Sequence, residues 1–389
     1  MNDITVLPGS DPAGNVILSN NKVYRGINKD FVNEYRNIYY ACLQNNLLGR
    51  HIIPTKIAND FKLEPFALLF EHERVKPYIY PFEWSLSMTM DAAYMVLNLV
   101  ISLDKIGLGL KDGHQFNTAY YAGSFYWIDF GSIIQHKTLS WMFEEFMDAF
   151  LNAIICMANG VHHRDAIYDY LTEENQRKYI ALRTMILEYA HTGAVTKAAQ
   201  LLYQWIRLYE AELKIISCPS AVPDVILSSI LSFIKERQIQ EALLISGEFS
   251  NVCFALSQNN IAVTVFHKNP EYIDFVYSQI KGKATRISPV LIDFLNPNSA
   301  NNEPKWLEAE QRFPAEIVIV FQYFSTAEPI DFTVLVKKLK AFTISYAIIE
   351  VIHPCSDELF AAIEHEFDII MTTEESYHQN KKLLFLKVK

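Results

Sequence analysis

The spacing of hydrophobic and polar residues changes character near residue 217 of this chain. Upstream, long stretches follow the period of a helix, with short strand-like runs between them. Downstream, short apolar runs alternate regularly with helical stretches. The segment Ser217-Cys218-Pro219-Ser220, with Pro223 close behind, interrupts both patterns and predicts a linker. We therefore expect two domains, residues 1–216 and residues 217–389.

The first domain is predicted to combine a few strands with many helices. Asparagines in the segment Ser19-Asn20-Asn21-Lys22 tolerate positive φ and predict a hairpin turn between two short strands. The stretch Ser87–Ile106 has too few polar residues for a surface helix, so we expect it to be buried on most sides. The other expected elements are a helix over Asp30–Asn46, a strand over Phe66–Phe70 and a hairpin of Thr118–Tyr121 with Phe125–Asp129.

The second domain is predicted to be a sheet covered by helices on both faces. Alternation of strands and helices with short connections is typical of a mostly parallel sheet. The expected strands are Ala242–Ile245, Ala262–Phe266, Val290–Phe294, Glu316–Phe321, Tyr346–Ile352, Phe367–Met371 and Leu383–Val388, of which the last two form an antiparallel pair. The expected helices are Pro270–Ile280, Lys305–Arg312, Phe332–Phe342 and Asp357–His365. The pattern thus predicts an α/β Rossmann-like domain with a mostly parallel seven-stranded sheet.

Composition narrows the classes of function. Half of the 389 residues are hydrophobic and a fifth are charged, which is typical of a folded protein. The net charge of −10 repels phosphate backbones, so we expect no nucleic-acid partner. The five cysteines are far apart and lack the paired spacing of zinc sites, which favours reduced thiols and a cytoplasmic location.

Neither a secretory signal nor a membrane span is expected. The first residues, MNDITVLPGSDPAG, contain no basic region followed by an apolar one. The longest apolar run, Ala92–Leu103, contains Asn98 and is shorter than the roughly 20 residues that a membrane span requires. We expect a small-molecule substrate and no membrane partner, and the sequence leaves open a homo-oligomer or a partner enzyme.

Two aspartates and an asparagine in the first domain form a candidate phosphoryl-transfer site. Asp112 and Asn117 make the pattern D-x-x-x-x-N, and Asp129 follows within Ile-Asp-Phe-Gly. Phosphoryl transfer requires a carboxylate beside the attacking hydroxyl and oxygen ligands for magnesium. We expect Asp112 to be the catalytic base, and Asn117 and Asp129 to hold the metal of Mg-ATP. The order of a buried helix, D-x-x-x-x-N, a hairpin and I-D-F-G resembles protein kinases.

The segment departs from the kinase pattern in its other parts. Leu110-Lys111 stands where kinases usually have His-Arg, and no G-x-G-x-x-G loop precedes the first strands. Lys29 and Lys56 are both candidates for the lysine that binds the nucleotide phosphates, with Glu71 or Glu73 as its partner. The alternative is an ordinary loop in which Asp112 and Asn117 bond the local backbone and Asp129 ends a strand.

A series of short motifs also runs through the first domain. They are Tyr80-Pro81-Phe82-Glu83-Trp84, Asp91-Ala92-Ala93, Leu110-Lys111-Asp112 with Asn117, and Ile128-Asp129. This series resembles the N-terminal segment of a bacterial family of two-domain class I S-adenosylmethionine-dependent methyltransferases, and looser matches continue beyond the linker. Together the resemblances predict an α+β kinase-like domain followed by a class I methyltransferase-type domain. Within the Tyr-Pro-Phe-Glu-Trp motif, Glu83 is expected either to cap the following helix or to face the nucleotide.

The cofactor signature of that family is degenerate in this chain. Class I methyltransferases bind S-adenosylmethionine at a glycine-rich turn after the first strand of an open α/β sheet and at an acidic residue after the second. Here the turn contains one glycine, Gly247, beside Glu248, and Leu244 stands about where an acidic residue belongs. The second strand ends at His267 without a carboxylate. If the pocket works, Gly247, Glu248 and His267 surround the cofactor.

Three functions remain open from the sequence. The first is an ATP- and magnesium-dependent phosphotransferase that uses Asp112, Asn117 and Asp129. The second is an S-adenosylmethionine-dependent methyltransferase whose first domain positions a small molecule. The third is a non-catalytic partner subunit that has lost both activities. The intact D-x-x-x-x-N and I-D-F-G motifs favour the first, and the eroded glycine turn weighs against the second.

Overall fold

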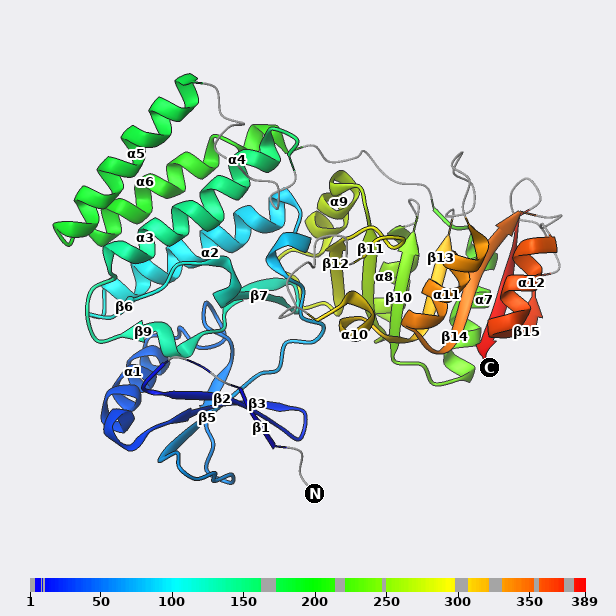
Figure 1. The fold of residues 1–389 in the computed structure, drawn as a ribbon, viewed down its shortest axis with the longest axis horizontal. Coiled ribbons are helices and arrows are strands. Elements are labelled where there is room, and N and C mark those ends of the chain that lie inside the picture. The colour runs from blue at the N-terminus through cyan, green and yellow to red at the C-terminus, as the bar shows by residue number, and fades with distance from the viewer. Residues whose placement is uncertain are drawn as a thin grey trace. The chain divides into compact units, whose positions relative to one another are not determined.

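The computed structural model describes most of the chain. It covers residues 4–7, 9, 11–161, 173–213, 221–246, 250–297, 307–321, 331–352, 357–373 and 381–389. Its contacts divide the chain into two compact units. The first comprises residues 1–82, 86–121 and 125–213, and the second comprises residues 83–85, 122–124 and 214–389. Figure 1 shows the helices and strands of both units.

An antiparallel sheet of five strands forms one part of the first unit. Its order is β1 (Ile4–Val6), β2 (Gly14–Ser19), β3 (Lys22–Ile27), β5 (Leu68–His72) and β4 (Thr55–Ile57). β2 and β3 form the expected hairpin, and Asn20 and Asn21 occupy its turn with φ of 50° and 62°. β1 is an edge strand that the hydrophobic pattern did not indicate.

The two faces of this sheet carry different side chains because successive residues of a strand point to opposite sides. On one face, Ile17, Tyr24 and Leu69 form a small core that the segment between β4 and β5 covers. On the other face, Arg25 of β3 lies opposite Phe70 of β5. Helix α1 (Val32–Gln44) packs against Phe70 through Tyr39. Arg25 therefore points to the same side of the sheet as α1.

Helices form much of the remainder of the first unit. α2 (Leu86–Asp104) packs against α4 and α6. It is long and apolar enough to cross a bilayer, with a mean hydropathy of 1.5, yet 67% of that stretch is buried inside the protein. Such burial is typical of a core helix, which agrees with the expectation from its sparse polar residues. The other helices are α3 (Ser140–Phe146), α4 (Asn152–Ala158), α5 (Glu173–His191) and α6 (Val195–Arg207).

A mixed sheet of seven strands forms the centre of the second unit (Figure 1). Its order is β12 (Ile287–Leu291), β11 (Ala262–His267), β10 (Glu241–Ser246), β13 (Ala315–Phe321), β14 (Thr343–Ile352), β16 (Lys381–Val388) and β15 (Phe367–Thr372). The strands from β12 to β14 are parallel, whereas β16 is antiparallel to β14 and β15. The expected terminal antiparallel pair is thus present, with its second strand inserted next to β14.

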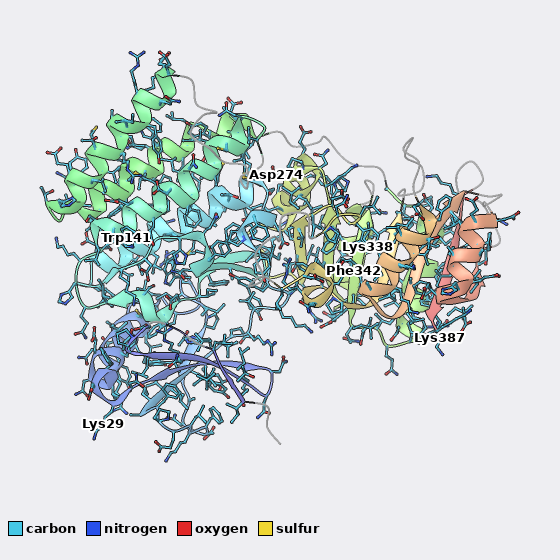
Figure 2. The ribbon with its side chains drawn as sticks, viewed as in Figure 1. Lys29, Trp141, Asp274, Lys338, Phe342 and Lys387 are labelled. Carbon is cyan, nitrogen blue, oxygen red and sulfur yellow. The ribbon has the colours of Figure 1, made fainter. Side chains whose placement is uncertain are left out.

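Right-handed crossovers place helices on both faces of this sheet. From β10 the chain moves through α8 and α9 toward β12, and from β13 it moves through α11 and α12 in the opposite direction, so the two helix pairs cover opposite faces. The ring of Phe342, labelled in Figure 2, is fully buried, with centroids 5.6 Å from Phe266 and 5.7 Å from Phe294. The helices are α7 (Asp224–Glu236), α8 (Ser250–Gln258), α9 (Pro270–Ile280), α10 (Ala309–Arg312), α11 (Phe332–Phe342) and α12 (Asp357–Glu366).

Some elements of the second unit differ from the expected ones. The pattern predicts a strand over residues 290–294, but β12 begins at Ile287 and includes Pro289. Proline is tolerated there because β12 is the edge strand, where one missing N–H need not break a ladder. The helix expected over residues 305–312 is shorter at its start: α10 begins at Ala309, with Glu308 as its N-cap, and residues 305 and 306 lie outside the described part. Helices α7 and α8 were not predicted.

A buried ion pair anchors residues 83–85 within the second unit. Glu83 accepts two hydrogen bonds from the guanidinium of Arg312, at 2.8 Å and 2.5 Å, and the two side chains are 1% and 4% exposed. Arg312 Nε also donates to the carbonyl of Leu307 over 3.1 Å. Because a buried charge is tolerated only when it is paired, each partner makes burial of the other possible. Glu83 therefore has a structural role in the second unit.

Replacing Arg312 by methionine should destabilise the second unit strongly. The change leaves the carboxylate of Glu83 buried without its partner, which costs about 3–5 kcal/mol in the free energy of unfolding. Urea denaturation, followed by hydrogen exchange in β10 and β13, measures the loss. Lys338→Met is the matched control, because it removes a more exposed pair with Glu310 that contributes less than about 1 kcal/mol. Equal losses in the two variants would contradict the prediction.

Candidate functional site

Two short strands bring parts of the candidate phosphoryl-transfer site together in the first unit. β6 (Gly109–Leu110) pairs antiparallel with β9 (Ile133–Ile134), and Leu110 lies opposite Ile133. Asp112 follows the end of β6, and Asp129 precedes the start of β9. Because the strands are antiparallel, the loops that carry these two aspartates meet at the same end of the ladder.

Asn117 lies beside the segment that carries Asp129. The hairpin of β7 (Thr118–Tyr121) and β8 (Ser124–Trp127) folds the chain back, so that the Ile128 N–H donates to the Asn117 carbonyl over 2.8 Å. Asn117 is buried, and its Nδ2 has no hydrogen-bond partner among the described residues. A buried amide without a partner is costly unless water or a ligand satisfies it.

Asp112 is half-buried among charged neighbours. Burial raises the pKa of its carboxyl above the usual value, and the negative charges of Asp129 and Glu145 raise it further, against the opposing charge of Lys111. The next residue donates its backbone N–H to Glu145 over 2.8 Å, which fixes the loop. A carboxylate with a raised pKa is a better proton acceptor, as a general base requires.

The rest of the Ile-Asp-Phe-Gly motif is fixed by the core. The ring of Phe130 is 1% exposed, with its centroid 5.0 Å from that of Phe70 and 6.3 Å from that of Tyr35. The Tyr35 hydroxyl donates to the Gly131 carbonyl over 2.9 Å, and the Gly131 N–H donates to Asp129 Oδ1 over 3.0 Å. No described residue donates a hydrogen bond to the second carboxylate oxygen of Asp129, which is therefore available to a cation.

Arg25 is the cationic side chain that reaches this motif. Its Nη1 lies 3.5 Å from Asp129 Oδ1, its Nη2 contacts Asp11, and the side chain is 9% exposed. A Cβ on Gly131 would lie 2.1 Å from Arg25 Nη2, so glycine leaves the room that the guanidinium occupies. Sequence reasoning missed Arg25 because only lysines were considered. The hairpin strand that carries Arg25 was predicted, but it counted as the second strand because β1 was not indicated by the sequence.

The two lysines proposed from the sequence lie elsewhere. Lys56 forms an ion pair with Glu71 over 3.2 Å between the neighbouring strands β4 and β5. Lys29 is exposed in the turn before α1, where Figure 2 labels it. Glu73 accepts a hydrogen bond from the Tyr121 hydroxyl over 3.0 Å. These contacts give no support to a Lys–Glu pair at the candidate site.

A metal in this site would depend on its ligand for part of the coordination shell. No group of three or more His, Cys, Asp or Glu side chains is arranged to hold a metal in the part of the chain that the structure describes. Asn117 and Asp129 are the two oxygen donors that fit magnesium, which commonly keeps waters and binds substrate phosphates beside one or two carboxylates. Two donors leave most of an octahedral magnesium shell to water or to a ligand.

The carboxyl ends of the parallel strands form the second candidate region. Ligands of open α/β sheets bind at this edge, where the strand order reverses between β10 and β13. His267 ends β11, and its Nδ1 accepts a hydrogen bond from the Asn269 N–H over 2.9 Å. This bond places the imidazole proton on Nε2. The ring also packs against Tyr272, with centroids 4.3 Å apart.

Asp293 lies next to His267 at the same edge. The Ile292 N–H donates to the His267 carbonyl over 3.1 Å, which brings the residues after β12 beside the end of β11. Asp293 was not proposed from the sequence, because it fell inside the strand predicted over residues 290–294, whereas the observed β12 ends at Leu291 and leaves Asp293 just beyond it. Gly247 and Glu248 lie outside the described residues. Leu244 is fully buried within β10, in a position unsuited to an acidic side chain.

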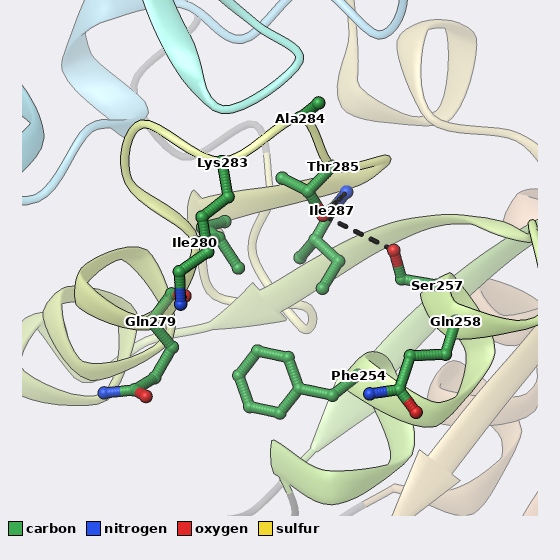
Figure 3. Close-up of a pocket in the computed structure, with 9 residues that line it drawn as sticks. All are labelled: Phe254, Ser257, Gln258, Gln279, Ile280, Lys283, Ala284, Thr285 and Ile287. Carbon is green, nitrogen blue, oxygen red and sulfur yellow. Dashed lines mark hydrogen bonds between the residues drawn. The ribbon is translucent and has the colours of Figure 1, made fainter.

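A cavity of about 410 Å³ lies at the opposite edge of the same sheet (Figure 3). Its lining comes from the end of α8, the end of α9 and the start of β12. Ser257 and Thr285 approach each other across it, with 3.4 Å between their hydroxyl oxygens. Because it lies at the amino ends of the strands, this cavity is separate from the edge where cofactors bind in such sheets.

Comparisons with known proteins find similarity in structure alone. No protein-family profile matches the chain, and no curated protein matches its sequence. Similar solved structures include magnesium protoporphyrin IX methyltransferase from Synechocystis with bound SAM (9% identity, 42% of this chain and 78% of that chain, TM-score 0.33). Others are the N-methyltransferase NodS from Bradyrhizobium japonicum (10%, 42% and 93%, 0.32) and a TehB-like SAM-dependent methyltransferase from Corynebacterium glutamicum (10%, 41% and 86%, 0.30). Likeness at this level assigns no activity to this chain.

His72 is a buried histidine beside the first site, and its titration affects the stability of the first unit. His72 of β5 shares a 2.9 Å hydrogen bond between its Nδ1 and Thr55 Oγ1, and its ring centroid lies 6.2 Å from that of Phe130. Burial lowers the pKa of His72 to about 4, and the positive charge of Arg25 acts in the same direction. The folded first unit therefore holds this imidazole neutral.

The first unit should lose stability as pH falls from about 6.5 toward 4. In that window the unfolded chain binds a proton at His72 that the folded unit excludes, so the free energy of unfolding drops by up to about 3 kcal/mol. Above pH 6.5 the His72 imidazole is neutral in both the folded and the unfolded chain, so the free energy of unfolding keeps its full value there. His72→Gln should flatten the dependence in urea unfolding between pH 4 and 7, whereas His136→Gln, at an exposed position, serves as control. Parallel curves for wild type and His72→Gln would show the idea to be wrong.

Proposed function

We propose that the second unit binds S-adenosylmethionine and transfers its methyl group to a small molecule. The observation that carries this proposal is the strand order of the seven-stranded sheet, with β16 antiparallel between β14 and β15. The resemblance of the sequence predicts a mostly parallel seven-stranded sheet with a terminal antiparallel pair, and this sheet agrees with that description; the insertion of its last strand next to β14 was not predicted. The reversal of strand order between β10 and β13 gives such a sheet its ligand crevice.

Two residues at that crevice suit the cofactor. The carboxylate of Asp293 can accept hydrogen bonds from ribose hydroxyls or from an adenine amino group. This would compensate for the missing acidic residue at the end of β11, since Asp293 lies beside His267. The imidazole of His267 lies at the same edge, where its Nδ1 accepts the Asn269 N–H. Gly247 and Glu248, after β10, remain the proposed contacts for the methionine part.

S-adenosylmethionine should raise the melting temperature of the protein. A ligand that binds only the folded state stabilises it by mass action, by about 2.7 kcal/mol at a hundredfold excess over Kd. Asp293→Asn should weaken binding about tenfold, because it removes a charge-assisted hydrogen bond. Asp368→Asn, on the edge strand β15, is the control and should bind normally. A flat melting temperature for the wild type at millimolar cofactor would contradict the proposal.

A second candidate function is an ATP- and magnesium-dependent phosphotransferase in the first unit. The observation that favours it is the contact of Arg25, on the third strand, with Asp129 of the Ile-Asp-Phe-Gly motif. Protein kinases place a cationic side chain of the third strand, a D-x-x-x-x-N loop and this motif around the same phosphates. Asp112 would accept the proton of the attacking hydroxyl, and Asn117 and Asp129 would hold magnesium.

The first unit also departs from that arrangement. β3 pairs with β2 here, and β1 forms the edge. An arginine replaces the lysine, which keeps the positive charge and adds donors in a planar fork. The loop between β1 and β2 carries Asp11 toward Arg25 where kinases have a glycine-rich loop. These differences leave the phosphotransferase as the second candidate.

Asp129→Asn should abolish magnesium-dependent ATP binding. The amide oxygen of asparagine can still accept the Gly131 N–H bond, so the motif should keep its shape while it loses the charge that attracts magnesium. Isothermal titration with ATP, with and without magnesium, measures the effect, and circular dichroism checks the fold. Asp30→Asn, at an exposed position, makes the same charge change away from the site. Equal affinity in the two variants would refute the assignment.

A further inference from the structure

We infer that Arg25 and Lys111 form a phosphate-binding site whose place is held, in this structure, by the carboxylate of Asp11. The inference deepens the second candidate function and rests on it for the identity of the ligand, a polyphosphate such as the phosphate chain of a nucleotide. The carboxylate of Asp11 acts as an internal competitor, which must leave the site before the ligand binds.

Asp11 lies in the loop between β1 and β2 and points toward two cations. Its Oδ2 contacts Arg25 Nη2 and lies 3.7 Å from Lys111 Nζ. Its other oxygen accepts the Ala13 N–H over 2.9 Å, which orients the carboxylate. One oxygen shared by a guanidinium and an ammonium is an arrangement that a phosphate oxygen also adopts, because both groups are strong donors to phosphate.

The carboxylate of Asp11 leaves part of Arg25 unsatisfied. The Nε of Arg25 is buried and has no hydrogen-bond partner among the described residues, although Nη1 and Nη2 each face an aspartate. A phosphate group presents more acceptor oxygens than a carboxylate and can bond an arginine at two nitrogens at once. A ligand phosphate in the place of Asp11 would therefore satisfy a donor that the aspartate cannot.

The loop is fastened to the end of β3 by a few local contacts. Asn28 donates its backbone N–H to the Ala13 carbonyl over 2.8 Å and its side-chain amide to the Pro12 carbonyl over 2.8 Å. A Cβ on Gly14 would lie 1.7 Å from the Gly26 carbonyl oxygen, so glycine is required for this close approach. Beyond this anchor, the two cations hold the Asp11 carboxylate in the site.

Competition of this kind lowers the apparent affinity for a ligand. When the binding-competent arrangement is a fraction of the population, the apparent Kd rises by the inverse of that fraction. Removing the charge of Asp11 should release the loop from Arg25 and Lys111. The neutral variant should then bind polyphosphate more tightly than the wild type, the opposite of what loss of a binding residue would give.

Isothermal titration of the full chain with inorganic tripolyphosphate, without metal, tests the inference. Asp11→Asn should bind it at least tenfold more tightly than the wild type, and the double variant Asp11→Asn with Arg25→Gln should lose this gain. Asp60→Asn, exposed in the first unit, makes the same change in net charge and should bind like the wild type. Thermal melting confirms that each variant is folded.

Three results would overturn the inference: equal or weaker binding by Asp11→Asn, a matching gain in Asp60→Asn, or no binding by any variant. A parallel titration with Mg-ATP separates it from the second candidate function. If tripolyphosphate binding tightens but Mg-ATP binds to no variant, the phosphate site stands and the phosphotransferase fails. If Mg-ATP binds wild type and Asp11→Asn equally, the phosphotransferase stands and the competitor role of Asp11 fails.

Discussion

The pairing of β6 with β9 is the constraint on which the first site depends. Two residues on each strand are enough to hold the end of one loop against the start of another, so the loops that carry Asp112 and Asp129 lie at the same end of the ladder although a hairpin separates them. The buried ring of Phe130 and the bond from Tyr35 to Gly131 then fix the second loop against β5 and α1. The polar groups are thus positioned by apolar packing directly beside them.

Electrostatics in the first site is organised around one buried cation. Arg25 is nearly inaccessible to water and touches two aspartates, which offsets the cost of burying its charge. The same charge helps to keep His72 neutral and gives Asp129 a fixed partner. An incoming anion would compete with these two carboxylates for the guanidinium of Arg25. The contacts that stabilise the site would therefore also oppose binding of an anionic ligand.

The second unit is governed by topology more than by individual contacts. Parallel strands require helical crossovers of one hand, and open sheets whose crossovers reverse direction, as here between β10 and β13, bind ligands at the carboxyl edge. His267 and Asp293 reach that edge because β11 and β12 are neighbours. The cavity at the amino ends of the strands lies away from this carboxyl edge. The topology therefore indicates which edge of this sheet would face a ligand, although the glycine turn is degenerate in the sequence.

The sequence by itself determined the elements with strong periodicity: the β2–β3 hairpin, the buried helix α2 and most strands of the second unit, because local hydrophobic spacing encodes them. It also singled out Asp112, Asn117 and Asp129 through local motifs. Only the tertiary structure placed Arg25 on Asp129, Glu83 on Arg312 and Asp293 beside His267, and it set β12 across Pro289 at the sheet edge. Contacts between distant residues depend on how strands are ordered in the sheet and on which charges can share burial, and local spacing carries neither.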